Sequence, residues 1–215
     1  MKRAIGDDQK TRRRLDIIES AKALLSERDF ESVTLTEVAS RLGLVKGTLY
    51  QYFPTKEALA LEVLERETGL WLEDLGRELE ANPVRSNGDL AGALAASLAQ
   101  RPLVVSLFSI VHIRLEKNLS PERLVAFKLK SAEALESGSD LLESSWPPLA
   151  GKGKETILAF YGLAIGIGHL TEHSASIETA LKTPGLEVFR LDFGTQLRKT
   201  MTWLLEGIIS QGSGR

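Results

Sequence analysis

The sequence predicts an all-α protein of about nine helices, in which an N-terminal three-helix head with a helix-turn-helix is joined to a larger helical body. Apolar residues recur at helical spacing along nearly the whole chain, and no segment has the period-two alternation of a strand. The stretch from Thr34 to Leu59, TLTEVASRLGLVKGTLYQYFPTKEAL, contains two closely spaced helical patterns followed at once by a third.

The first helix of the chain is expected from about Asp7 to Arg28. The second begins at Thr34, because Thr34 and Glu37 have the order of a capping box, in which each residue satisfies a backbone donor of the other. It ends at Gly43, since glycine readily adopts the left-handed conformation that closes a helix. The connection to the next helix is only three residues long, which is typical of a helix-turn-helix.

In the third helix Leu49 and Phe53 lie four residues apart and are expected to point inward. Pro54 stops this helix and Thr55 caps the fourth. The remaining helices are expected at about 56–81, 89–99, 102–118, 121–145, 154–175 and 187–211.

A helix-turn-helix places its second helix in the major groove of DNA. Lys46 supplies a charge for phosphate or guanine, Gly47 allows close backbone approach, Tyr50 offers a hydroxyl to phosphate, and Gln51 can recognise adenine. Lys56 lies beside a helix N-terminus, where a phosphate is favoured. The candidate DNA-binding residues are Thr34, Thr36, Lys46, Gly47, Thr48, Tyr50, Gln51, Tyr52 and Lys56. Tyr52 is equally compatible with a place in the core.

At these residues the sequence resembles the TetR family of one-component transcriptional regulators. The matching positions are Ala21, Leu24, Phe30, Thr34, Val38, Ala39, Gly43, Lys46, Gly47, Leu49, Tyr50, Phe53, Lys56, Glu57 and Leu59. Asp29, Val45 and Tyr52 depart from the family pattern. The resemblance implies a DNA-binding head over residues 1–55 and a ligand-binding and dimerisation body over 56–215.

Charge and composition agree with this division. Residues 1–56 contain 11 Lys or Arg against 8 Asp or Glu, whereas residues 57–215 contain 16 against 21, so the positive charge favours the head as the DNA-facing part. The basic run Arg12–Arg14 fits a contact with phosphate or with the minor groove, and it fits a solvated charge run equally well. The chain has no cysteine, no apolar run long enough for a membrane span and no signal-peptide pattern, so we expect a soluble cytoplasmic protein without a cofactor.

The helices expected at 154–175 and 187–211 have wide apolar faces. Gly162, Gly166 and Gly168 lie inside the first of them and indicate close approach by another helix or by a ligand, since each costs about 1 kcal/mol relative to alanine. Two such helices from each of two subunits can form a four-helix dimer interface, which the family resemblance also implies.

The resemblance further implies a pocket for a small-molecule effector inside the body. The candidate lining residues are Phe108, His112, Phe127, Phe160, Tyr161 and His169, each of which is also compatible with plain core packing. His112 lies in the apolar run LVVSLFSIVHI, where an unpaired polar group is costly, so we expect it to have a hydrogen-bond partner from the protein, from water or from a ligand, most simply as a satisfied core histidine.

Two other classes of function stay open at this point. His169, Glu172 and His173 spell the H-x-x-E-H pattern of a zinc protease, with a carboxylate such as Glu178 as the third ligand, although so short a pattern also arises by chance. A helical adaptor that binds proteins and no DNA is the second alternative. The favoured interpretation is a homodimeric repressor released from a palindromic operator by a small hydrophobic ligand.

Overall fold

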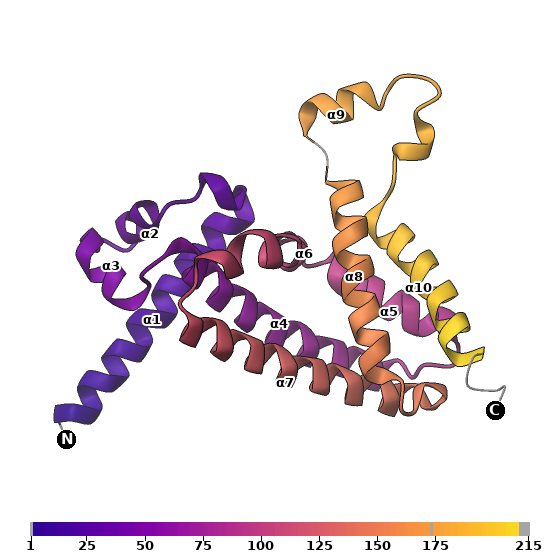
Figure 1. Ribbon diagram of the computed structural model, residues 1–215, viewed down its shortest axis with the longest axis horizontal. Helices are drawn as coiled ribbons and strands as arrows, with labels where there is room; N and C mark the ends of the chain where they lie inside the picture. The colour runs from indigo at the N-terminus through magenta and orange to yellow at the C-terminus, as the bar shows by residue number, and fades with distance from the viewer. Residues whose placement is uncertain (1, 173, 211–215) are drawn as a thin grey trace. The chain divides into compact units, whose positions relative to one another are not determined.

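A computed structural model describes residues 2–172 and 174–210, and these residues form helices and no strands (Figure 1), as the sequence predicts. The α-helices are α1 Lys2–Glu27, α2 Leu35–Arg41, α3 Lys46–Tyr52, α4 Lys56–Ala81, α5 Asn87–Ala99, α6 Pro102–Ile110, α7 Pro121–Ser145, α8 Gly153–Thr171, α9 Ala175–Ala180 and α10 Phe193–Ser210. Among the described residues this is one helix more than expected, because α9 is separate from α8.

The chain divides into two compact units. The first comprises Met1–Glu67 and Ile110–Lys128, and the second comprises Thr68–Ser109 and Leu129–Arg215. The first unit therefore contains α1, α2, α3 and the start of α4, together with the segment that leads into α7 and the first turns of α7. Its core includes Ile17, Leu49, Phe53 and Leu61, all fully buried. Full burial of such a side chain stabilises the fold by roughly 1.5–3 kcal/mol.

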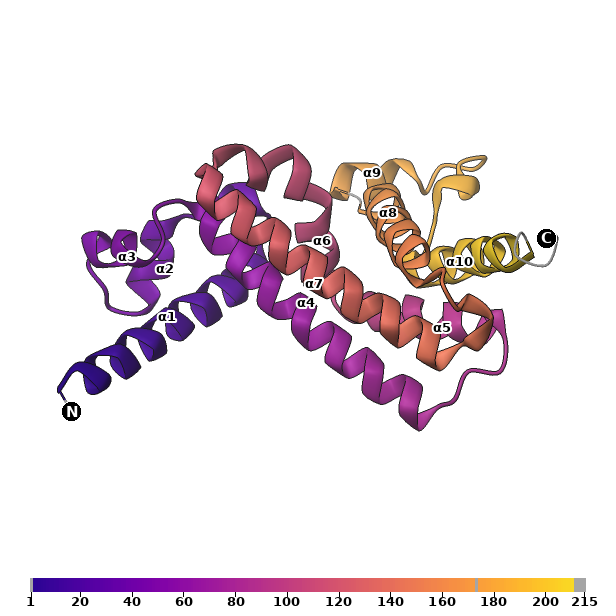
Figure 2. The same cartoon turned by 60° about the horizontal axis from the view of Figure 1, so that its bottom comes forward.

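In the second unit α10 packs on both α5 and α8 (Figures 1 and 2). The apolar stripe of α5, with Leu90, Leu94 and Leu98 at helical spacing, is completely buried, and Met201 and Leu205 of α10 are buried as well. Gly168 of α8 allows a close approach, since a Cβ there would lie 2.8 Å from Cγ1 of Val105 in α6. The expected close contact is therefore present at Gly168.

The helix expected over 102–118 is interrupted. α6 ends at Ile110, a π-helical turn follows over Val111–Leu115, and a 3-10 turn occupies Glu116–Asn118. Side-chain periodicity alone did not indicate this change of winding, because apolar residues continue through it. Among the described residues no single helix is long and apolar enough to cross a membrane, and only α5 with the segment 102–118, bent by 86°, reaches that length and apolarity together.

The expected limits of the last two long helices are wrong. α8 ends at Thr171 and not near residue 175, because the Ser174 hydroxyl accepts from the backbone N–H of Ile177 and starts α9. α10 begins at Phe193 and not at 187, because the Asp192 carboxylate accepts from the backbone N–H of Thr195. Both boundaries are set by N-cap hydrogen bonds.

Candidate nucleic-acid interface

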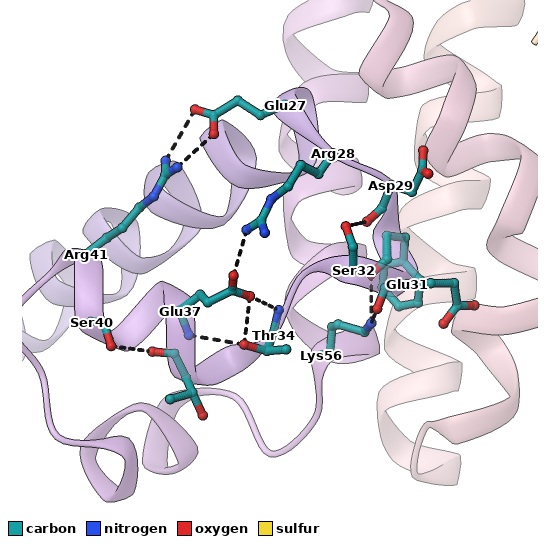
Figure 3. Close-up of polar contacts among 12 residues, drawn as sticks. Glu27, Arg28, Asp29, Glu31, Ser32, Thr34, Glu37, Ser40, Arg41 and Lys56 are labelled. Atoms are coloured by element: carbon teal, nitrogen blue, oxygen red, sulfur yellow. Dashed lines mark hydrogen bonds and ion pairs between the residues drawn. The ribbon is translucent and has the colours of Figure 1, made fainter. Parts of the chain in front are cut away.

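The capping box predicted at the start of α2 is present (Figure 3). The Thr34 hydroxyl accepts from the backbone N–H of Glu37, and the Glu37 carboxylate accepts from the backbone N–H of Thr34 at 2.9 Å. Arg28 of the preceding segment donates to the other carboxylate oxygen of Glu37. The Thr34 hydroxyl also donates to the Glu37 carboxylate at 2.8 Å, and this bond, followed by the one from Arg28, lowers the pKa of Glu37.

The turn after α2 is built on Gly43, whose φ of +63° lies in the left-handed region. The N–H of Gly43 donates to the carbonyl of Ser40, and the N–H of Leu44 donates to that of Ala39, so these two carbonyls near the end of α2 are satisfied. α3 then starts at Lys46. The predicted helix-turn-helix is therefore formed as the sequence indicates.

α3 divides into a buried side and an exposed side. Leu49, together with Phe53 at the end of the helix, is buried in the first unit. Lys46, Gly47, Tyr50 and Gln51 are exposed, and Thr48 is half-buried. A Cβ at Gly47 would have no atom within 4 Å, so the backbone there is open to an approaching partner.

Val45 was not expected as a contact residue, yet it lies at the N-cap of α3 with 73% of its surface exposed. An apolar side chain at this position suits a thymine methyl group in the major groove. The only sign of it in the sequence is that Val45 stands where the family usually has a small polar residue.

Two of the predicted contact residues, Thr34 and Lys56, already have side-chain hydrogen-bond partners within the first unit. The Thr34 hydroxyl is engaged by Glu37 in the capping box, while Thr36 is exposed and accepts only through its carbonyl, from Ser40. Nζ of Lys56 donates to the carbonyl of Phe30 at 2.7 Å and to that of Glu31 at 3.2 Å (Figure 3). Any phosphate contact by Lys56 has to compete with these bonds.

Arg14 fixes the C-terminal end of α3. Its guanidinium donates to the Tyr52 carbonyl at 3.3 Å, forms two hydrogen bonds to the Glu62 carboxylate of α4, and lies 4.4 Å from the centre of the Phe53 ring. Such a bidentate pair has a defined geometry. The basic run of α1 therefore has two parts: Arg14 is structural, whereas Arg12 and Arg13 are exposed.

Of the predicted ligand-binding residues, three aromatic ones lie in the second unit. Phe108 and Tyr161 make an edge-to-face ring contact at 5.0 Å, and the buried Phe160 stacks with Trp71 at 6.1 Å. His169, also in this unit, is exposed near the end of α8. These contacts are compatible with aromatic core packing.

His112 and Phe127 belong to the first unit, and Phe127 is buried. His112 is not a core residue, because 54% of its side-chain surface is exposed; its Nδ1 lies 3.2 Å from the Glu116 carboxylate. The expectation of a polar partner is met, but the expectation of burial is wrong. The π-helical turn accounts for the difference, since it rotates His112 relative to the register of a continuous α-helix.

The zinc-protease interpretation of H-x-x-E-H gains no support from the described residues. That motif requires one continuous helix, whereas α8 ends at Thr171 and Glu172 is extended. His173 lies outside the described residues, and among the described ones no three metal-ligating side chains gather.

Comparisons with known proteins cover both parts of the chain. A family model described as bacterial regulatory proteins, tetR family, matches residues 17–63, and one described as tetracyclin repressor-like, C-terminal domain, matches residues 65–212. The HTH-type transcriptional repressor KstR of Mycobacterium tuberculosis is 26% identical over 120 residues, which are 55% of this chain and 54% of that protein. The chain thus matches about half the length of that relative.

Two solved structures are similar in fold. A transcriptional regulator from Saccharomonospora viridis in complex with choline has a TM-score of 0.56 at 19% identity, covering 91% of this chain and 96% of that one. FadR from Bacillus subtilis in complex with stearoyl-CoA has a TM-score of 0.50 at 14% identity, covering 91% and 97%.

Proposed function

Because the chain belongs to the TetR family of transcriptional regulators, we propose that it is a repressor that binds a palindromic operator as a homodimer and leaves it when a small hydrophobic ligand binds. The observation that carries this proposal is α3, a short helix anchored by Leu49 and Phe53 with a polar face open to solvent. Residues 1–55 act on DNA in this scheme, and residues 56–215 bind the ligand and the second subunit. Such a protein works where the bacterial chromosome lies, in the cytoplasm.

In the proposed complex α3 enters the major groove. Lys46, Gln51 and Val45 face base edges, while the hydroxyl of Tyr50 reaches phosphate. The supporting contacts come from Thr34, Thr36, Thr48, Tyr52 and Lys56, with Gly47 allowing the backbone to approach. The capped and ion-paired start of α2 supports this assignment, because it holds the helix-turn-helix rigid before DNA arrives.

The proposed dimer forms through α8 and α10. Leu158, Gly162, Gly166 and Leu170 follow one another at four-residue steps on α8; both leucines are exposed, and neither glycine has an atom within 4 Å of where a Cβ would lie. On α10 Trp203 is 57% exposed. Small residues between exposed apolar ones permit close packing of a partner helix, and burying these leucines and Trp203 favours association.

The proposed ligand occupies the second unit near the aromatic contacts of Phe108, Phe160 and Tyr161. An apolar lining with few polar groups suits a hydrophobic molecule. To weaken operator binding about a hundredfold, the ligand has to prefer the state that does not bind DNA by about 2.7 kcal/mol. Calorimetry of ligand with free protein and with the operator complex tests this, because the two ligand affinities must differ by the same factor; equal affinities contradict induction.

The DNA-binding proposal is tested by selecting bound fragments from random and genomic DNA with the full chain. We expect enrichment of a symmetric sequence whose half-sites lie one helical turn, about 34–36 Å, or a multiple apart. Lys46→Ala and Tyr50→Ala, both on the exposed face of α3, should abolish this enrichment. If no sequence is enriched by the folded wild-type protein, or if both variants select as the wild type does, the proposal fails.

A further inference from the structure

A second charged surface lies beside α3, on the N-terminal half of α1. A cleft of about 700 Å³ separates the two helices. Its lining residues are Gln9, Lys10, Arg12, Arg13 and Asp16 of α1 and Gln51 and Tyr52 of α3. Three cations and one carboxylate face the same space, so the cleft carries a net positive charge.

Lys10, Arg12 and Arg13 do not contribute to the packing of the first unit. Over residues 8–27 of α1, for which the structure describes burial, the first buried residue is Ile17, and residues 8–13 are exposed. Arg14, the next residue, is held by Glu62 and by the Tyr52 carbonyl. By contrast, among the side chains that the structure describes, Lys10, Arg12 and Arg13 form no hydrogen bond or ion pair. Unpaired cations on one side of a cleft attract a polyanion, and bidentate guanidinium groups suit phosphate in particular.

The position of the cleft identifies the polyanion. Gln51 and Tyr52 belong both to the cleft and to the proposed DNA-binding face of α3, so the cleft is continuous with that face. We propose that Lys10, Arg12 and Arg13 bind the phosphate backbone of the same duplex that α3 enters, which extends the interface onto α1. This inference rests on the proposed DNA-binding function. Such contacts add affinity and position the protein without recognising bases.

Arg14 has a distinct part in this surface. Its bonds to Tyr52 and Glu62 and its contact with the Phe53 ring tie α1 to α3 and α4 at the base of the cleft. The cations are thereby held at a fixed place relative to Gln51. Because the cations are already in place, contacts to the DNA backbone and to the bases can form together, without the entropy cost of ordering a flexible segment on binding.

The test measures affinity of the full-length protein for a mixed-sequence duplex and for the selected operator across a salt series. The variant Arg12→Gln with Arg13→Gln should weaken binding to both duplexes by the same factor. The salt slope should become shallower by about 0.9 for each phosphate that the variant no longer neutralises. Arg85→Gln with Lys182→Gln is the matched control, since it removes the same charge from exposed positions of the second unit that do not line the cleft, and should leave the slope unchanged.

The variant Asp16→Asn should change DNA affinity in the opposite direction to the arginine variant. Removing the carboxylate of the cleft should strengthen binding to both duplexes, and circular dichroism should show unchanged folding because Asp16 is exposed. The inference is overturned if the arginine variant matches the control, or if Asp16→Asn binds as the wild type does. Inorganic phosphate at constant ionic strength should compete with DNA for the wild type more strongly than for the arginine variant; equal competition for both proteins also overturns the inference, since the cleft then takes no phosphate of its own. Failure of the wild type to bind any duplex contradicts the proposed function itself.

Discussion

The atoms that surround Gly153 leave no room for a side chain at this position. Gly153 opens α8, and its N–H donates to the Glu143 carboxylate at 2.8 Å. A Cβ at this position would lie 2.4 Å from Oγ and 2.7 Å from the carbonyl oxygen of Ser139. Backbone atoms cannot yield as a flexible side chain can, so glycine is required here.

We therefore predict that Gly153→Ala destabilises the protein by about 1–3 kcal/mol, as overpacking does. Gly69→Ala is the matched control, because this glycine lies inside α4 and a Cβ there meets no atom within 4 Å. The control should gain up to about 1 kcal/mol from helix propensity. Urea unfolding measures both, and a stability of Gly153→Ala equal to that of the wild type contradicts the packing argument.

Glu37 links the stability of the helix-turn-helix to pH. Hydrogen bonds from Thr34 and Arg28 hold its pKa below the ordinary value of 4.5. A carboxylate whose pKa is lowered by folding stabilises the protein above its unfolded pKa, and this contribution disappears as the pH falls through the folded pKa. The decrease therefore begins near pH 4.5 and is complete below the folded pKa.

We expect thermal unfolding followed from pH 7 into this acid range to show a steeper fall in Tm for the wild type than for Glu37→Gln. The variant should already be less stable at pH 7, because its amide lacks the ion pair with Arg28. Parallel curves for the two proteins would mean that Glu37 has the same pKa in the folded and unfolded chain.

At the scale of one element, the two faces of α3 should separate stability from DNA binding. Leu49→Ala removes a fully buried side chain and should cost about 2–5 kcal/mol. Tyr50→Ala changes an exposed residue at the next position and should alter stability by less than about 0.5 kcal/mol while DNA affinity falls. Chemical unfolding and DNA titration of both variants provide the check. A large drop in stability of Tyr50→Ala would place that ring in the core.

How well the sequence predicted an element depended on how its ends are determined. α4 and α7 begin and end where expected, because Pro54 with Thr55 and Ser120 with Pro121 are strong local start signals. The end of α8 and the start of α10 were missed, since Ser174 and Asp192 act as caps only in a particular backbone conformation. The winding change at Val111–Leu115, which places His112 at the surface, has no periodic signature at all.

The candidate interface, too, could be predicted from the sequence only in part. Helical periodicity was enough to predict which side of α3 faces solvent. It could not reveal that Lys56 bonds to the carbonyls of Phe30 and Glu31, or that Arg14 and Arg12 have different surroundings. Those facts depend on contacts between residues far apart in the sequence.

At the scale of the whole molecule, the exposed apolar residues of α8 and α10 predict self-association. Leu158→Arg with Trp203→Arg places two charges in the proposed interface and should convert a dimer into a monomer. Val125→Arg is the control, because this valine is an exposed apolar residue of α7 outside that surface. Sedimentation velocity distinguishes the species; a monomeric wild type, or a double variant that stays dimeric, contradicts the proposed interface.

The central claim is that the exposed face of α3 recognises a specific DNA sequence. The most direct measurement is the ratio of affinities for the selected operator and for a shuffled duplex of equal length at physiological salt. We predict a ratio of at least about 10³ for the wild type. The double variant Lys46→Ala with Tyr50→Ala should have a ratio near one and an unchanged Tm. A wild-type ratio near one, or an undiminished ratio in the folded double variant, would contradict the claim.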